Sequence, residues 1–496
     1  MLTYYLSEYK NLPLYEALFD CIRRDILSGT LSEGERLPSK RALAKHLNIS
    51  ITTVEHAYQK LEEEAYLVSR PGCGFFVEKR GAPVEPTDPL PSLIHAELPV
   101  DVIGGGYDHT DSVTMLGAGA ADKKAYKVEL TENHSSLSLF PSGVWVRLIR
   151  QILSESTSEN SELFHSVPYN GLYSLREAIS EYLRKYRGFT VSPDQIIIGA
   201  GTEYLYQRLI QLLGVGAIIA FADPGYKALA RGCMTSGHVI QFIPMGSEGL
   251  DIRSLRRSIA NVVHLSPANH FPTGAIMPLE QRAEIIKWAG ETTSRYIIED
   301  DYDCEFSSRG SDIMPLFAMD RNDRVIYMNT FSKTLVPSIR ISYMVLPKTL
   351  LPLYENSLSF YSCTASGFEQ QALTRFISEG HLERHVDKLK NHYDRKCRRF
   401  VEALESSRLS PIITIPNRGA GTHLLIRVRT GMTDQEIRAE AERQGIHISL
   451  LSDYCYRPRP YDLQTLVVNV AALQDEQEGI ASAISALERL FLERQN

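Results

Sequence analysis

The sequence contains no run of about 18 consecutive apolar residues, which is the length that a membrane-spanning helix needs. Its first residues, Met1-Leu2-Thr3-Tyr4-Tyr5, lack the basic region and apolar core of a secretory signal. Cysteine is scarce: there are seven, an odd number, and no two form a C-x-x-C pair. These absences argue against a membrane protein, a disulfide framework and a zinc or other metal site. We therefore expect the protein to work in the reducing cytoplasm.

Basic residues are fewer than acidic residues over the whole chain, and the formal net charge is −7. One segment departs from this balance, because between Arg36 and Lys60 there are five basic residues and a single acid, Glu55. A short basic segment in an acidic chain predicts a small DNA-binding module attached to a larger body. At about 150 residues per domain, 496 residues are enough for about three structural units.

Residues 8–79 have the pattern of one compact α+β unit. Three helices are expected at 14–28, from the N-cap Ser39 onward, and at about 51–65, and a strand, a Gly-containing turn and a strand follow over 67–77. This order predicts a winged helix-turn-helix, whose third helix enters the major groove of DNA. A helical bundle with a solvated charged face is the alternative that the helix pattern alone leaves open.

Polar and basic side chains stand where such a module contacts DNA. Four side chains at the start of the third helix would face the edges of the DNA bases: Ser50, Thr52, Thr53 and His56. Phosphates would be held at the start of the second helix by Ser39, Lys40 and Arg41. Arg36 adds to the basic segment, and Arg70 in the wing is placed for a phosphate or minor-groove contact.

Three ordered strings in this region resemble the GntR family of bacterial regulators. They are Arg36-Leu37-Pro38-Ser39-x-Arg41-x-Leu43-Ala44, Thr53-Val54-x-x-Ala57-Tyr58-x-x-Leu61 and Arg70-Pro71-Gly72-x-Gly74-x-Phe76-Val77. The resemblance covers nearly all of residues 8–79 and implies double-stranded operator DNA as the partner. Many relatives have a basic residue after the turn serine, where this chain has Ile51, so the basis for one DNA contact is missing.

A different composition begins after the wing. Residues 80–127 are rich in Pro and Gly and show little periodicity, which is typical of a linker. Over 128–496, helical patterns alternate with short apolar runs that end near Gly, Pro, Asp or Ser, such as Ile196-Ile197-Ile198 and Val325-Ile326-Tyr327-Met328. Buried strands of a mostly parallel α/β sheet read in this way. A helical segment beyond about 385 leads into a smaller C-terminal subdomain.

Chemistry-bearing side chains follow several of these apolar runs. Lys333 lies in a polar loop after a strand, which suits a Schiff base with an aldehyde cofactor. A phosphate would be bound by Thr330, Ser332 and Arg340, and by the N–H groups of Gly201, Thr202 and Glu203 at a helix start. Among the carboxylates of Glu299-Asp300-Asp301 we expect Asp300 to face a pyridine nitrogen. Tyr302 would hydrogen-bond the ring's 3-oxygen, and Tyr226 would stack on the ring.

In this order and spacing the motifs resemble those of fold-type I aminotransferases, over about residues 128–480. Pro168-Tyr169-Asn170-Gly171 and Phe271-Pro272-Thr273-Gly274 belong to the same pattern. The resemblance implies pyridoxal phosphate as the cofactor and Lys333 as the lysine bonded to it. The combined architecture resembles the MocR subgroup of GntR regulators, which implies a homodimer in which each DNA-binding unit lies against the partner's large domain.

Two positions depart from the aminotransferase pattern. Val467, in Leu466-Val467-Val468-Asn469-Val470-Ala471, stands where an arginine that grips the substrate carboxylate is expected, and valine cannot replace a bidentate guanidinium. Phe271 replaces the asparagine that precedes Pro-Thr-Gly, so Asn269 or His270 would have to substitute for it.

These departures favour a transcription regulator that senses pyridoxal phosphate or an amine through Lys333. Two other interpretations stay open: a working aminotransferase with an accessory N-terminal unit, and a degenerate domain that only dimerises. An amino acid, another amine and pyridoxal phosphate itself all remain candidate effectors.

Overall fold

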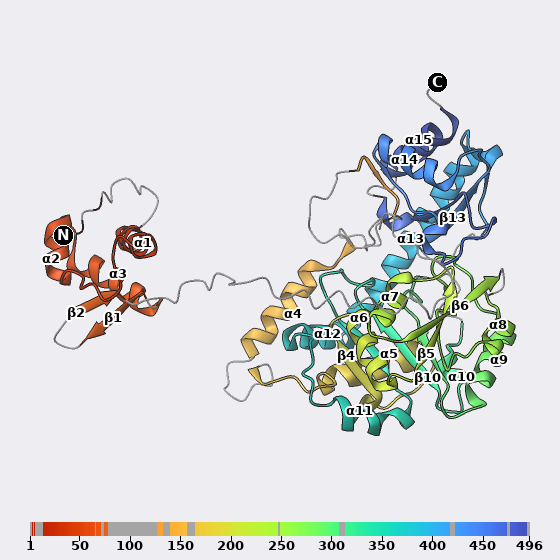
Figure 1. Ribbon diagram of the computed structural model, residues 1–496, viewed down its shortest axis with the longest axis horizontal. Helices are drawn as coiled ribbons and strands as arrows, with labels where there is room; N and C mark the ends of the chain where they lie inside the picture. The colour runs from red at the N-terminus through yellow and green to blue at the C-terminus, as the bar shows by residue number, and fades with distance from the viewer. Residues whose placement is uncertain are drawn as a thin grey trace. The chain divides into compact units, whose positions relative to one another are not determined.

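The computed structural model describes residues 2, 4, 13–64, 66–70, 74–77, 126–131, 139–155, 164–246, 249–306, 313–416, 422–473 and 477–493. The chain divides into two compact units, Met1–Val113 and Thr114–Asn496 (Figure 1). The predicted linker over 80–127 lies almost wholly outside the described residues. None of the described helices is both long enough and apolar enough to cross a membrane.

The first unit is a winged helix-turn-helix, as predicted. Its elements are α1 (Leu14–Leu27), α2 (Lys40–Leu47), α3 (Ile51–Glu63) and the antiparallel strands β1 (Leu67–Arg70) and β2 (Gly74–Val77). The apolar faces of the three helices meet in one core, where Leu18, Ile22, Leu43, Val54 and Leu61 are fully buried. The 3.6-residue period of these positions is therefore what holds the three helices together.

Local hydrogen bonds set the turn between α2 and α3. Ser39 caps α2 by accepting from the Ala42 N–H at 3.2 Å, and Ser50 caps α3 by accepting from the Thr53 N–H at 3.0 Å. Asn48 ends α2 in the left-handed region at φ +54°, which Asn tolerates better than most residues. The two helices are thus separated by a turn that the sequence Asn48-Ile49-Ser50 dictates.

An eight-stranded sheet forms the centre of the second unit. Its order is β4 (Ile196–Gly199), β11 (Ser342–Val345), β10 (Val325–Thr330), β9 (Tyr296–Asp300), β8 (Val262–Leu265), β5 (Ile218–Asp223), β6 (Val239–Gly246) and β7 (Gly249–Leu250). The pairings from β10 through β9, β8 and β5 to β6 are parallel, whereas β11 is antiparallel to both of its neighbours. The predicted α/β sheet is confirmed, with β4 running in the same direction as the parallel strands.

Helices cover both faces of this sheet. Ile196 and Ile198 of β4 join a core with α5 (Tyr173–Tyr186) and α12 (Gly367–Ser378). Ile197 points the other way, into a core with α6 (Thr202–Leu213) and α7 (Lys227–Thr235). Burial on both faces explains why the strands read as continuous apolar runs.

The C-terminal part has its own sheet and core. The sheet comprises β12 (Ile413–Thr414), β13 (His423–Val428) and β15 (Thr465–Asn469), covered by α14 (Asp434–Gln444) and α15 (Glu478–Leu492). The long helix α13 (His381–Ser406) connects it to the large sheet (Figure 1). Strand β3 (Val128–Glu129) pairs with β14 (Ile446–His447), so the start of the unit joins its C-terminal part.

Candidate functional site

The start of α3 carries a cluster of hydroxyl groups on the surface of the first unit. The Ser50 hydroxyl lies 2.8 Å from that of Thr52 and 2.7 Å from that of Thr53. His56, one turn further on, is exposed and its ring packs edge-on against Tyr15 of α1 at 5.8 Å. The four residues predicted to contact bases therefore lie together, and Ser50 also serves as the helix cap, a role that the prediction left out.

Basic side chains border this cluster. The Lys40 ammonium lies 2.7 Å from Glu55 of α3, and this hydrogen bond lowers the pKa of the Glu55 carboxyl. Arg41 is exposed one residue further along α2. In the wing, Arg70 stacks on the Phe76 ring at 4.8 Å, and Arg36 pairs with Phe76 through an antiparallel bridge. Helix α2 and the wing thus both present cations, while Ser39 is engaged as a cap.

Five of the predicted cofactor motifs follow the carboxyl ends of β4, β5, β8, β9 and β10. Because these strands run in one direction, their ends meet at one edge of the sheet. Ligands of open α/β sheets bind at such an edge. The topology therefore gathers segments separated by more than 100 residues.

The turn after β4 forms a cradle for an anion. Gly201 is the N-cap of α6 at φ +105°, and a Cβ built on it would lie 2.4 Å from Nη2 of Arg340. This close approach and the positive φ both require glycine. The Arg340 guanidinium also lies 2.9 Å from Glu203 in the first turn of α6, and both side chains are about half exposed. A helix N-terminus and a guanidinium at one point favour negative charge.

Thr330 and Ser332 hold the loop that carries Lys333. The Thr330 hydroxyl accepts from the Ser332 N–H at 3.2 Å and from the Ser342 hydroxyl at 2.8 Å. The Ser332 hydroxyl donates to the Ile339 carbonyl at 3.1 Å. Both hydroxyls thus hold the loop between β10 and β11 in place. From the sequence a different role is predicted for them, the binding of a phosphate.

Lys333 is half-buried in the loop that follows β10. Its Nζ lies 4.1 Å from the centroid of the Tyr302 ring. Burial lowers the pKa of Lys333, although the carboxylates of Asp303 and Asp300 oppose that shift. A lysine with a lowered pKa is more often neutral, which is the form that attacks a carbonyl carbon.

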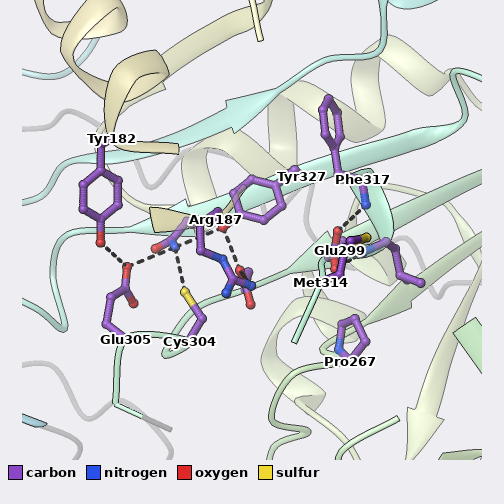
Figure 2. A network of polar contacts seen from close by, with 12 residues as sticks. Tyr182, Arg187, Pro267, Glu299, Cys304, Glu305, Met314, Phe317 and Tyr327 are labelled. Carbon is purple, nitrogen blue, oxygen red and sulfur yellow. Dashed lines mark hydrogen bonds and ion pairs between the residues drawn. The ribbon is translucent and has the colours of Figure 1, made fainter. Parts of the chain in front are cut away.

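The three consecutive carboxylates at the end of β9 have different surroundings. Glu299 accepts from the N–H groups of Leu316 and Phe317, at 2.7 and 2.8 Å. Asp301 forms a buried ion pair with Arg187 at 2.6 Å and accepts from the Tyr327 hydroxyl at 2.7 Å. Figure 2 shows Glu299 with Phe317, and Arg187 near Tyr327. Both carboxylates are thus engaged with the folded chain.

Asp300 faces the other side of the sheet. Its carboxylate lies 3.6 Å from Nε2 of His264, and both side chains are nearly buried. Side chains alternate along a strand, so Asp300 is separated from the network that engages its two neighbours. Of the three carboxylates, it is the one whose charge acts on Lys333.

Asp303 is a site residue that the sequence prediction missed. It accepts a hydrogen bond from Nδ2 of Asn269 at 2.7 Å, and burial raises its pKa to about 7 while the charge of Lys333 opposes this. The repeated acids in Asp300-Asp301-Tyr302-Asp303 were the available signal. His270, the alternative to Asn269, bonds Thr273 at 2.8 Å, and burial lowers its pKa to about 3, so it serves the turn as a neutral ring.

Aromatic rings connect this edge to the C-terminal part. Tyr226 is 38% exposed, and its ring lies 6.3 Å from Phe271. Phe271 in turn contacts His423 of β13 and Tyr454, with ring centroids 5.0 Å apart in both cases. Val467 is buried in the same cluster, together with Leu425 and Leu451. The position expected to hold an arginine is thus part of a buried apolar cluster.

Comparisons with known proteins agree with both halves of this description. Residues 14–77 match the bacterial regulatory proteins of the gntR family, and residues 127–446 match the aminotransferase class I and II family. The chain is therefore a helix-turn-helix regulator joined to an aminotransferase domain.

Relatives over nearly the full length identify the family. An uncharacterized HTH-type transcriptional regulator YdeL of Bacillus subtilis is 32% identical over 97% of this chain and 98% of its own length. The probable rhizopine catabolism regulatory protein MocR of Rhizobium meliloti is 29% identical, over 96% and 94%. The pyridoxine biosynthesis regulator PdxR of Corynebacterium glutamicum is 26% identical, over 90% of each. The protein belongs to the MocR family of transcription regulators.

Solved structures support the fold of the second unit. An archaeal alanine:glyoxylate aminotransferase covers 74% of this chain and 91% of its own with a TM-score of 0.66 and 21% identity. The kynurenine aminotransferase of Pyrococcus horikoshii covers 74% and 92%, with a TM-score of 0.62 and 23% identity. The predicted fold-type I architecture is thereby confirmed.

Proposed function

We propose that this regulator binds operator DNA through its first unit and pyridoxal phosphate through Lys333 of its second unit. Ligand occupancy of the second unit, in place of steady transamination, would control transcription. The observation that carries the proposal is one sheet edge that holds Lys333 beside Tyr302, Asp300 beside His264 and Arg340 beside Gly201, while Val467 stands where a substrate-gripping arginine is expected.

The residues at this edge fit the cofactor. Gly201 keeps a cradle open between the start of α6 and the Arg340 guanidinium, which suits a phosphate. Asp300 supplies a carboxylate for a pyridine nitrogen, Tyr302 a phenol for a ring oxygen and Tyr226 a ring face. The Oδ1 atom of Asn269 is buried without a hydrogen-bond partner among the described residues, so this part of the site has acceptor capacity left for a ligand.

Each side chain has a definable task. When bound, pyridoxal phosphate supplies an aldehyde that combines reversibly with amines. Lys333, whose pKa burial lowers, provides the neutral amine at that point. Asp300, beside His264, would keep a proton on the neighbouring ring nitrogen. Arg340 and the N-terminus of α6 would orient the phosphate group of the cofactor. In the present structure Glu203 contacts the Arg340 guanidinium.

We propose further that the regulator is a homodimer in which each DNA-binding unit lies against the partner's large domain. Amine or cofactor binding would change the closure of the large domain and thereby the spacing of two DNA-binding units. The exposed aromatic side chains of the second unit support an association surface, among them Phe164 at 62% and Phe360 at 75% exposure.

Visible absorption spectroscopy tests the cofactor assignment. Purified protein titrated with pyridoxal phosphate should develop an absorption band distinct from that of the free cofactor. Lys333→Ala should lose this band while keeping the far-ultraviolet circular dichroism of the wild type. Lys287→Ala, which removes an exposed lysine of α9 (Leu279–Gly290), is the matched control and should keep the band.

The same preparation separates sensing from catalysis. Sustained conversion of a common amino acid and an oxo acid by the loaded protein would contradict the regulatory proposal and favour the aminotransferase alternative. Absence of the band in the wild type would contradict cofactor binding and favour a domain that only dimerises.

A further inference from the structure

We infer that the second unit has its own contact surface for the phosphate backbone of double-stranded DNA, on one face of α13 and the adjoining part of α4 (Ser142–Glu155). We call this surface the basic strip, and it consists of Arg147, Arg384, Lys388, Arg395, Arg398 and Arg399. The inference goes beyond the proposed function, which assigns DNA binding to the first unit, and it rests on that binding.

The helical period places the α13 residues of the basic strip on one face. Positions three, four or seven apart share a face of a helix, and the five basic residues follow this spacing from Arg384 to Arg399. All five are exposed. The opposite face of α13 is buried, and it includes Leu382, Leu389, Tyr393 and Phe400. The basic strip therefore points away from the core of the second unit.

Helix α4 continues the basic strip beyond the start of α13. The Arg147 guanidinium lies 3.4 Å from Nε2 of His381, and the Arg384 guanidinium lies 2.9 Å from Nδ1 of the same ring. The exposed Arg147 also lines a hollow on the surface of α4, together with Arg150 and Gln151. Cations of two helices thus meet at one point.

The carboxylates around the basic strip are mostly engaged or set to one side. Glu379 lies 3.2 Å from His381, and Glu383 lies 3.8 Å from Lys185 of α5. Asp394 is half-buried, Asp387 is exposed at the edge of the strip, and Glu402 and Glu155 lie at its ends, the latter paired with Arg375. From His381 to Phe400 there are seven lysines and arginines and three acids. This face is therefore positive, although the whole chain has a net charge of −7.

The spacing of the cations is unfavourable for the helix itself. Arg384 and Lys388 are four positions apart, and so are Arg395 and Arg399, and like charges at this spacing repel each other. A polyanion relieves this repulsion and releases its own condensed counterions when it binds. From Arg384 to Arg398 the helix rises about 21 Å, which matches about six phosphates along one strand of a duplex.

DNA is the polyanion that the rest of the chain brings to this surface. A duplex bound by the helix-turn-helix is tethered to the second unit through the covalent chain, which raises its effective concentration there. Contacts with phosphates position a duplex but carry no sequence information. We therefore expect the basic strip to add affinity for DNA of any sequence.

Fluorescence anisotropy of the full chain with a random-sequence duplex of about six helical turns tests the inference. The triple variant Arg384→Ala, Lys388→Ala and Arg398→Ala removes three cations and introduces the residue that favours a helix most. The dependence of log affinity on log salt concentration should become shallower by about two to three units, and affinity at low salt should fall at least about tenfold.

A matched triple variant controls for the loss of charge alone. Arg253→Ala on α8 (Ile252–Arg257), Lys287→Ala on α9 and Arg321→Ala before β10 remove three exposed cations of the second unit outside the basic strip. This variant should keep the salt dependence of the wild type.

Photochemical crosslinking provides a readout that does not depend on the triple variant. Asn391 is exposed on α13 between Lys388 and Arg395. The photoreactive residue benzoylphenylalanine, incorporated in place of Asn391, should crosslink to the bound duplex. The same residue in place of the exposed Glu284 on α9 should not.

The outcomes separate the inference from the proposed function. An unchanged salt dependence in the triple variant, or no crosslink from position 391, would overturn the inference and leave DNA binding by the first unit intact. Dissociation of a wild-type dimer by the triple variant in analytical ultracentrifugation would also overturn it, because the basic strip would then be a contact between subunits. A wild type that binds no duplex would overturn the proposed function itself.

Discussion

Glu299, Asp300 and Asp301 are adjacent in the chain, yet they lie in three different environments. Glu299 binds the backbone at the start of α10 (Leu316–Met319; Figure 2), and Asp301 pairs with Arg187. Asp300 is left on the opposite side of β9, next to His264. Chemical identity says little about role here, because the alternating direction of strand side chains and the partners across the sheet decide it.

A prediction at the scale of a single residue concerns Arg41, whose expected contact is with a DNA phosphate. It is exposed beside the capped start of α2, so Arg41→Ala should weaken DNA binding similarly for all sequences. The dependence of log affinity on log salt concentration should become shallower by about one unit, because one fewer counterion is released. Fluorescence anisotropy with operator and random duplexes over a salt series measures this.

Arg321→Ala is the control, because it removes an exposed arginine of the second unit and should leave the salt dependence unchanged. A change of base preference at one operator position in Arg41→Ala would contradict the phosphate assignment.

Strands β3 and β14 pair at the point where the described part of the second unit begins. Glu129 of β3 lies 2.7 Å from Nδ1 of His447 on β14, and Tyr126 stacks on the His447 ring at 4.6 Å. Burial raises the pKa of Glu129, but hydrogen bonds from His447 and Thr131 outweigh burial and hold the pKa at about 2. The pairing of β3 with β14 is thus stabilised by the Glu129 carboxylate in its ionised form.

This pairing predicts a specific acid sensitivity. Because the folded pKa of Glu129 is lowered, its contribution is full above the ordinary value near 4.5 and is lost as the pH falls toward 2. The wild type should lose about 2 kcal/mol of unfolding free energy over this interval relative to Glu129→Gln. Urea unfolding at several pH values measures the difference, and parallel pH profiles would show that the carboxylate does not stabilise this element.

At the scale of the whole molecule, the second unit exposes several aromatic rings. In a chain that is not associated with a second copy, these rings contact water. Phe164 packs edge-on against Phe368 at 6.5 Å, and Phe360 packs against Tyr361 at 4.2 Å. Exposed aromatic side chains that pack in pairs mark association surfaces more often than single exposed apolar residues do.

The proposed homodimer gives these rings a testable role. Phe360→Ser should raise the dimer dissociation constant about tenfold or more, because the burial of a large aromatic ring contributes strongly to association. Analytical ultracentrifugation over a concentration series measures it. Ile259→Ser, which replaces a similarly exposed apolar residue before β8, should leave it unchanged. A monomeric wild type would refute the dimer.

What the sequence by itself determined is local. Helix periods, the cap Ser39, the turn at Asn48 and the apolar runs of buried strands depend on neighbours within a few residues, and the structure reproduces them. The order of the motifs also indicated the family, because each one combines a strand end with a particular side chain.

Only the tertiary structure decided which side chains meet. The contact of Asn269 with Asp303, the contact of Glu203 with Arg340, and the burial of Val467 near Phe271 join residues that are 34 to 196 positions apart. Strand direction and the packing of two sheets bring them together, and no local pattern encodes such a distance. The sequence showed that an arginine is absent at Val467, and the fold showed that a buried apolar cluster has taken its place.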